Sequence, residues 1–135
     1  MGRLYLVVKQ VFDVDGYWGV IVFWNVDYNF FDDVELELRM IGFSKAAIEE
    51  VRKSMESGEA KAVTCSNNHT SVVLFNKHDS IADYISSIVH EAEHVKQSML
   101  KSYQVEDIGE APAYTIGYIV KKMWEVFNKF LQITK

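Results

Sequence analysis

The chain has 135 residues, a net charge of −5 and 49% hydrophobic residues. This length suits one ordinary domain, and the composition excludes a disordered or collagen-like chain. The single cysteine, Cys65, excludes a disulfide-rich secreted module and favours a reducing, cytoplasmic location. The acidic balance argues against nucleic acid as a partner, and no apolar run is long enough to span a membrane. We therefore expect a single domain over residues 1–135.

The first two elements are predicted to form a β-hairpin. Residues 4–12 are rich in Val, Leu and aromatic side chains, which favour strands. The segment 13–16 ends in Asp15-Gly16, a strong hairpin turn signal because both residue types tolerate positive φ. Residues 17–24 then form the return strand, and their continuous apolar character indicates a central position in the sheet.

Two helices are expected next. Asp27 is a plausible N-cap for a helix whose apolar residues recur at helical spacing as far as Ile41, and Gly42 is a natural C-terminal stop. Ser44 can cap the second helix, which Gly58 ends in the same way. Both helices have one apolar face, so we expect both to pack against the sheet.

A second hairpin is expected over residues 61–66 and 70–75, with Asn67 and Asn68 at the turn because asparagine accepts the left-handed conformation. If residues 70–75 form a sheet edge, an extended peptide could pair with them. The simpler interpretation is an ordinary strand of a small sheet. The tryptophans and Cys65 are interpreted as core residues.

The last two elements are longer helices. Ser80 opens a capping-box-like segment, and the helix that follows runs to about Tyr103. After a polar loop, Pro112 fits the first turn of the final helix. The predicted inward-facing residues of the two helices are Ile81, Ile85, Ile88, Ala92, Val95 and Met99, and then Ile116, Ile119, Val120, Met123, Phe127 and Phe130. The predicted fold class is α+β, with two hairpins in one small sheet and about four helices.

The motif His90-Glu91-Ala92-Glu93-His94 lies within the third predicted helix. His90 and His94 are four residues apart, so both imidazoles project from one face and can reach one tetrahedral zinc ion at about 2.0–2.1 Å. Glu91 flanks that face, where its carboxylate could accept a proton from a metal-bound water. This is the H-E-x-x-H pattern of zinc metallopeptidases. The alternative is a partly exposed helix whose histidines are ordinary polar residues.

A catalytic zinc site needs a third protein ligand. Glu110 is the preferred candidate, because a short loop between antiparallel helices would bring the start of the final helix back beside the third. It could instead be a carboxylate that the helix dipole favours at an N-terminus. Glu106, Asp107 and His78 are the competing ligands.

Tyr114 lies four residues after Glu110 and shares its helix face. A phenol at this position could donate to the oxyanion of a tetrahedral intermediate. The alternative interpretation is a packing aromatic ring with a solvated hydroxyl.

The segment from Ser87 to His94, followed by Glu110-Ala111-Pro112-Ala113-Tyr114, resembles the zincin superfamily and specifically its gluzincin branch. It is also similar to small metallopeptidases of bacteriophages and of mobile elements in gut bacteria. The resemblance covers roughly residues 78–120. It implies a minimal zincin-like domain whose two C-terminal helices carry one zinc ion, with His90, His94 and Glu110 as ligands and Glu91 as general base.

The expected function is therefore hydrolysis of a peptide bond in a peptide or protein substrate. The interval between His94 and Glu110 is shorter than in large gluzincins, and the chain ends soon after the final helix. An open site would position a peptide poorly. The alternative is a catalytically weak or inactive zincin-like module that acts by protein binding, and a weaker one is a hydrolase of non-peptide amides.

Overall fold

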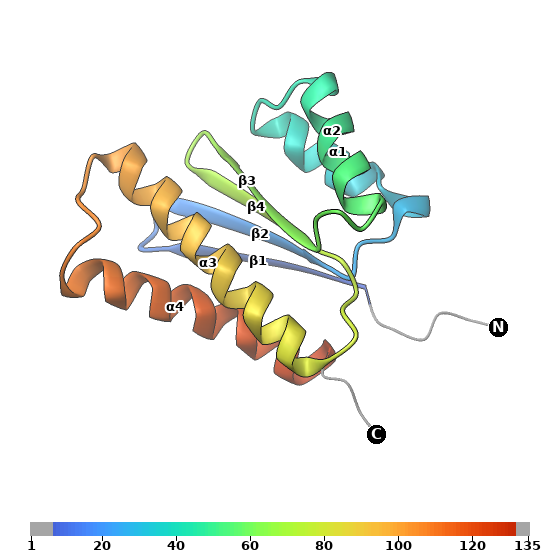
Figure 1. Cartoon of the computed structure of the whole chain (residues 1–135). Coiled ribbons are helices and arrows are strands. Elements are labelled where there is room, and N and C mark those ends of the chain that lie inside the picture. The colour runs from blue at the N-terminus through green and yellow to red at the C-terminus, as the bar shows by residue number, and fades with distance from the viewer. Residues whose placement is uncertain (1–6, 132–135) are drawn as a thin grey trace.

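The computed structural model describes residues 7–131 as a four-stranded sheet between two pairs of helices (Figure 1). The strands are β1 (Val8–Val14), β2 (Trp18–Trp24), β3 (Ala62–Asn67) and β4 (Thr70–Phe75). The helices are α1 (Asp32–Met40), α2 (Lys45–Glu56), α3 (Ile81–Tyr103) and α4 (Glu110–Val126), with a 3-10 helix η1 (Tyr28–Phe30) and a π-helical turn η2 (Phe127–Leu131). This arrangement confirms the predicted α+β class.

Both predicted hairpins are present, and they join through a parallel pair of strands. β1 and β2 are antiparallel, β3 and β4 are antiparallel, and β2 runs parallel to β4, which gives the strand order β1-β2-β4-β3. The predicted central position of residues 17–24 is confirmed. The hypothesis that residues 70–75 form a sheet edge is wrong, because β4 has a hydrogen-bonded neighbour on each side. The edge on that side of the sheet is β3.

Each face of the sheet buries its own apolar cluster. On one face Trp24 packs with Ile88 of α3 and Met123 of α4, and its ring stacks on that of Phe75 with centroids 4.4 Å apart. On the other face the cluster joins β-strand residues to α1 and α2, and Leu38 is fully buried there. Figure 1 shows the same separation, with α3 and α4 on one side of the sheet and α1 and α2 on the other.

Local signals in the sequence explain how most elements begin and end. The Ser44 hydroxyl accepts the Ala47 N–H at the start of α2, and the Ser80 hydroxyl accepts the Asp83 N–H at the start of α3, both at 3.1 Å. Gly42 follows α1 with a φ of +100°, a conformation that L-residues rarely adopt. These caps and this stop confirm the predicted starts of α2 and α3 and the predicted end of α1.

Two predicted boundaries move, and a third lies partly outside the described residues. β1 extends to Val14, so the turn is Asp15-Gly16 itself, with φ of 55° and 73°. The predicted strand begins at residue 4, and residues 4–6 lie outside the described part of the chain. Asp27 does not cap α1 but η1, where its carboxylate accepts the Asn29 N–H at 2.9 Å, and α1 begins only at Asp32.

Two residues predicted to face inward are exposed. Ile85 is 44% exposed and Phe130 is 50% exposed. The buried stripe of α3 is centred on Ile88, Ala92 and Val95, so Ile85 lies outside it. Phe130 follows the change from α-helix to the π-helical turn, which rotates side chains away from the α-helical register. No helix within residues 7–131 has the length and apolarity needed to cross a membrane.

Candidate functional site

Helix α3 presents the two motif histidines to solvent, one turn apart. Both side chains are exposed, and the Nε2 atoms of His90 and His94 lie 3.1 Å from each other. Two nitrogen ligands of one tetrahedral zinc ion, each at about 2.0–2.1 Å from the metal, lie about 3.3 Å apart. The geometry of this histidine pair therefore fits two ligands of one metal ion.

Glu91 follows His90 in α3, and its side chain is buried, with 3% of its surface exposed. Its Oε1 accepts a hydrogen bond of 2.7 Å from the Thr64 hydroxyl, whereas Oε2 has no protein donor within residues 7–131 and reaches solvent. Glu91 also forms no ion pair with a described residue. The Glu91 carboxylate is thus fixed by a hydrogen bond at Oε1, and its Oε2 can accept a proton from solvent.

The partner of Glu91 belongs to β3, the edge strand of the sheet. The side of α3 that carries Glu91 and His94 therefore faces this edge, and α3 runs beside β3 in Figure 1. One side of β3 pairs with β4, so the backbone groups on its other side have no strand partner among residues 7–131. The histidine pair lies next to a strand edge at which an extended chain could pair.

Cys65 follows Thr64 but packs into the cluster on the opposite face of the sheet. Burial raises the pKa of its thiol to about 11, and the nearby Glu91 carboxylate adds to this effect. A thiol with this pKa is protonated near neutral pH, and its burial confirms the interpretation of Cys65 as a core residue.

Glu110 and Tyr114 lie together at the start of α4, where they line a shallow hollow with Ala113. Tyr114 is 73% exposed. The side of α3 that faces α4 and the loop before it carries Lys96, which forms an ion pair with Asp107 at 2.9 Å. Glu110 thus belongs to elements on the opposite flank of α3 from Glu91 and His94. In addition, α3 continues for nine residues after His94, about 14 Å along its axis.

The other candidate ligands also lie apart from the histidine pair. Asp107 is held by Lys96. His78 is buried, its Nε2 lies 2.7 Å from the Ser87 hydroxyl, and its ring stacks on Tyr84. Glu106 is exposed in the loop between α3 and α4. Within residues 7–131, no group of three or more His, Cys, Asp and Glu side chains is arranged to hold a metal ion.

Sequence reasoning therefore located the residues that share one helix and missed those that come from the sheet. His90, Glu91 and His94 lie together as their spacing predicted. Thr64, which holds Glu91, is 27 residues away in the chain, and no sequence signal marked it. Comparison with protein-family models, with curated proteins and with solved structures finds no match for this chain.

Proposed function

We propose that this chain is a small zincin-like, zinc-dependent hydrolase that cleaves peptide bonds. The observation that carries the proposal is the exposed pair of Nε2 atoms 3.1 Å apart, beside a carboxylate fixed at one oxygen. His90 and His94 would hold the ion. Glu110, the third ligand that the sequence predicts, lies on the other flank of α3, so the proposal rests on the two histidines.

A bound zinc ion would polarise the scissile carbonyl and acidify a water molecule. Glu91 would act as the general base and acid. It would accept a proton from that water at the solvent-accessible Oε2 and pass it to the leaving amine. Thr64 positions this carboxylate through Oε1. Glu91 is buried and forms no ion pair with a described cation, so no basic side chain among residues 7–131 occupies its second oxygen.

The unpaired edge of β3 supports a peptide rather than a small amide as the substrate. An extended peptide that pairs with a sheet edge gains main-chain hydrogen bonds without a deep cleft. Such pairing would offset the open geometry of a site with no second lobe within the described residues. The lone buried thiol of Cys65 is consistent with action in a reducing, cytoplasmic compartment.

A zincin-like module that acts by protein binding is the second candidate. One observation favours it. Among residues 7–131, two metal-ligating side chains meet at the histidine pair, and no third ligand joins them. Such a module would use the same exposed edge of β3 to bind a protein segment without cleaving it.

Metal analysis and one pair of matched variants test the proposal. Protein purified without chelators should contain about one zinc ion per chain. Glu91→Gln should keep the zinc and lose cleavage of a mixed peptide library, whereas Glu93→Gln should keep both, because Glu93 bonds only Lys96 and Gln97 among residues 7–131. Cleavage that survives Glu91→Gln, or protein that cannot be loaded with zinc, would overturn the proposed activity. Zinc binding without any cleavage would favour the binding module.

A further inference from the structure

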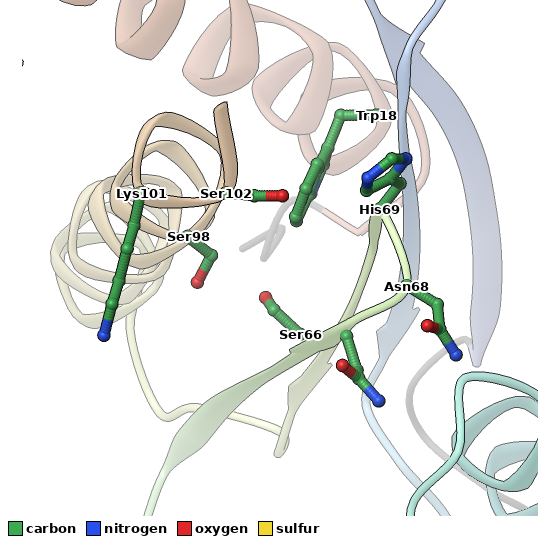
Figure 2. Close-up of a pocket in the computed structure, with 8 residues that line it drawn as sticks. Trp18, Ser66, Asn68, His69, Ser98, Lys101 and Ser102 are labelled. Atoms are coloured by element: carbon green, nitrogen blue, oxygen red, sulfur yellow. The ribbon is translucent and has the colours of Figure 1, made fainter. Parts of the chain in front are cut away.

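A pocket of about 680 Å³ opens between the β3–β4 turn and the C-terminal half of α3 (Figure 2). Trp18 forms the inner end of the pocket and is 2% exposed. Its ring N–H donates a hydrogen bond of 2.9 Å to the buried Ser71 hydroxyl. Figure 2 shows the Ser66 and Ser98 hydroxyls pointing into the space from β3 and α3. The pocket is thus polar on two sides and aromatic at its inner end.

The charge of this pocket is entirely positive. Lys101 lines it, no lining residue is Asp or Glu, and Lys101 forms no ion pair with any residue of the described chain. Lys9 and Lys96, by contrast, each bind two carboxylates. The Ser66 hydroxyl pairs with that of Ser71 at 2.6 Å, whereas the Ser98 hydroxyl has no hydrogen-bond partner among residues 7–131. An ammonium group that lines the same pocket is suited to a carboxylate ligand, to which it can donate charge-assisted hydrogen bonds.

The pocket lies further along the helix that carries the histidine pair and the strand that carries Thr64. Ser98 is one helical turn after His94, and Lys101 is seven residues after it, about 10 Å along α3. On the other wall, Ser66 lies two residues after Thr64 on the same side of β3. An extended peptide advances about 3.3 Å per residue, so the pocket lies two or three peptide residues from the metal ligands.

The wall formed by the β3–β4 turn is held in place from outside the pocket. The side-chain amides of Asn67 and Asn68 both donate to the Ile41 carbonyl, at 2.8 and 3.0 Å. His69 adopts a φ of 59°, and its ring contacts those of Trp18 and Tyr103. A wall that is already ordered loses little entropy when a ligand binds, which favours selectivity.

We propose that this pocket is a subsite for a carboxylate of the peptide substrate, two or three residues from the cleaved bond, with Lys101 as its cation. The inference rests on the proposed peptidase activity for the register of the peptide. The carboxylate can come from an Asp or Glu side chain or from the C-terminus of the peptide, and both present the same group to Lys101.

Binding of dye-labelled ten-residue peptides, followed by fluorescence anisotropy with and without zinc, tests the subsite apart from catalysis. Each peptide is rich in Ala, Val, Ser and Thr and carries one Glu at a successive position, with a matched Gln peptide. Free and amidated C-termini distinguish a side-chain carboxylate from a terminal one. We expect about tenfold tighter binding of one Glu or free-terminus peptide than of its neutral match.

Lys101→Gln should reduce that preference to less than about twofold, and Lys101→Glu should reverse it toward a peptide with Lys at the same position. Lys53→Gln is the matched control, an exposed lysine on α2 across the sheet, and should keep the preference. Equal binding of charged and neutral peptides, a preference that survives Lys101→Gln, or no binding of any peptide would overturn the subsite. Cleavage without an acidic preference would refute the subsite alone, whereas acidic preference without cleavage would refute the peptidase alone.

Discussion

The Thr64 hydroxyl donates a 2.7 Å hydrogen bond to the Glu91 carboxylate and so joins the edge strand β3 to the motif helix α3. The bond fixes the buried carboxylate of the motif, while the two histidines beside it stay exposed. Because one carboxylate oxygen is held and the other reaches solvent, the position of the proposed base depends on a residue from a different element. The site is thus built by the packing of α3 on β3.

Thr64→Val, which keeps the shape of the side chain and removes the hydroxyl, tests that dependence. We expect kcat to fall about 10- to 100-fold with little change in KM or zinc content, because Glu91 loses its positioning partner. The free energy of unfolding should fall by about 1–3 kcal/mol, since a buried carboxylate loses a hydrogen bond. Steady-state kinetics and urea unfolding measure both effects.

Thr70→Val is the matched control for this substitution. The Thr70 hydroxyl donates to the Asn68 carbonyl at 3.2 Å within the β3–β4 turn and does not contact Glu91. Kinetics should therefore stay close to those of the parent protein. Equal losses of kcat in both variants would show that the hydroxyl of Thr64 has no special relation to the reaction.

Glu110→Gln tests the third ligand. With α4 placed as described, we expect zinc affinity to stay within about threefold of the parent, whereas His94→Gln should lower it by more than about tenfold because it removes a ligand. Competition with a coloured chelator measures both affinities, and His69→Gln controls for loss of a histidine elsewhere. A tenfold loss in Glu110→Gln would show instead that the start of α4 reaches the metal.

The elements that the sequence predicted best are those set by neighbouring residues. The serine caps of α2 and α3, the Asp15-Gly16 turn and the stop at Gly42 each depend on a few adjacent positions. The parallel pairing of β2 with β4 joins segments about fifty residues apart, and periodicity contains no information about which strands become neighbours. That pairing makes β3 the edge and places β4 inside the sheet, which excludes the alternative that residues 70–75 form an edge.

The same distinction applies to the candidate site. His90 and His94 meet because a helix places residues four apart on one face, so the sequence alone was sufficient. The placement of Glu110 depends instead on which flank of α3 the helix α4 covers. Lys96 and Asp107 join that flank to the loop before α4, a tertiary contact that no local pattern announced. The sequence therefore predicted which residues share a face of α3, but not which side of α3 the helix α4 packs against.

Two glycines offer a stability test with opposite signs. Gly42 has a φ of +100°, and a Cβ there would lie 3.1 Å from the Asn67 amide nitrogen that holds the β3–β4 turn. Gly42→Ala should lower the free energy of unfolding by about 1–2 kcal/mol. Gly117 lies in α4, and a Cβ at this position would meet nothing within 4 Å, so Gly117→Ala should raise it by about 0.5–1 kcal/mol. Urea unfolding of both variants measures the two changes, and a shift of the same sign in each would contradict the argument.

His78 should make the fold sensitive to mild acid. Burial lowers the pKa of its imidazole below the usual value of 6.5, so the folded chain takes up this proton at lower pH than the unfolded chain does. The unfolded state then binds more protons as the pH falls below about 6.5, and stability must decrease in that direction. Urea unfolding at pH 7.5 and 5.5 measures the decrease.

The substitution His78→Gln separates this effect from the titration of other groups. Glutamine can still bond the Ser87 hydroxyl, which lies 2.7 Å from the imidazole Nε2, but it does not titrate. The variant should therefore lose less stability than the parent between pH 7.5 and 5.5. His69→Gln removes an exposed histidine and should keep the parent's decrease. If the two variants respond to acid alike, the buried imidazole of His78 is not the group responsible.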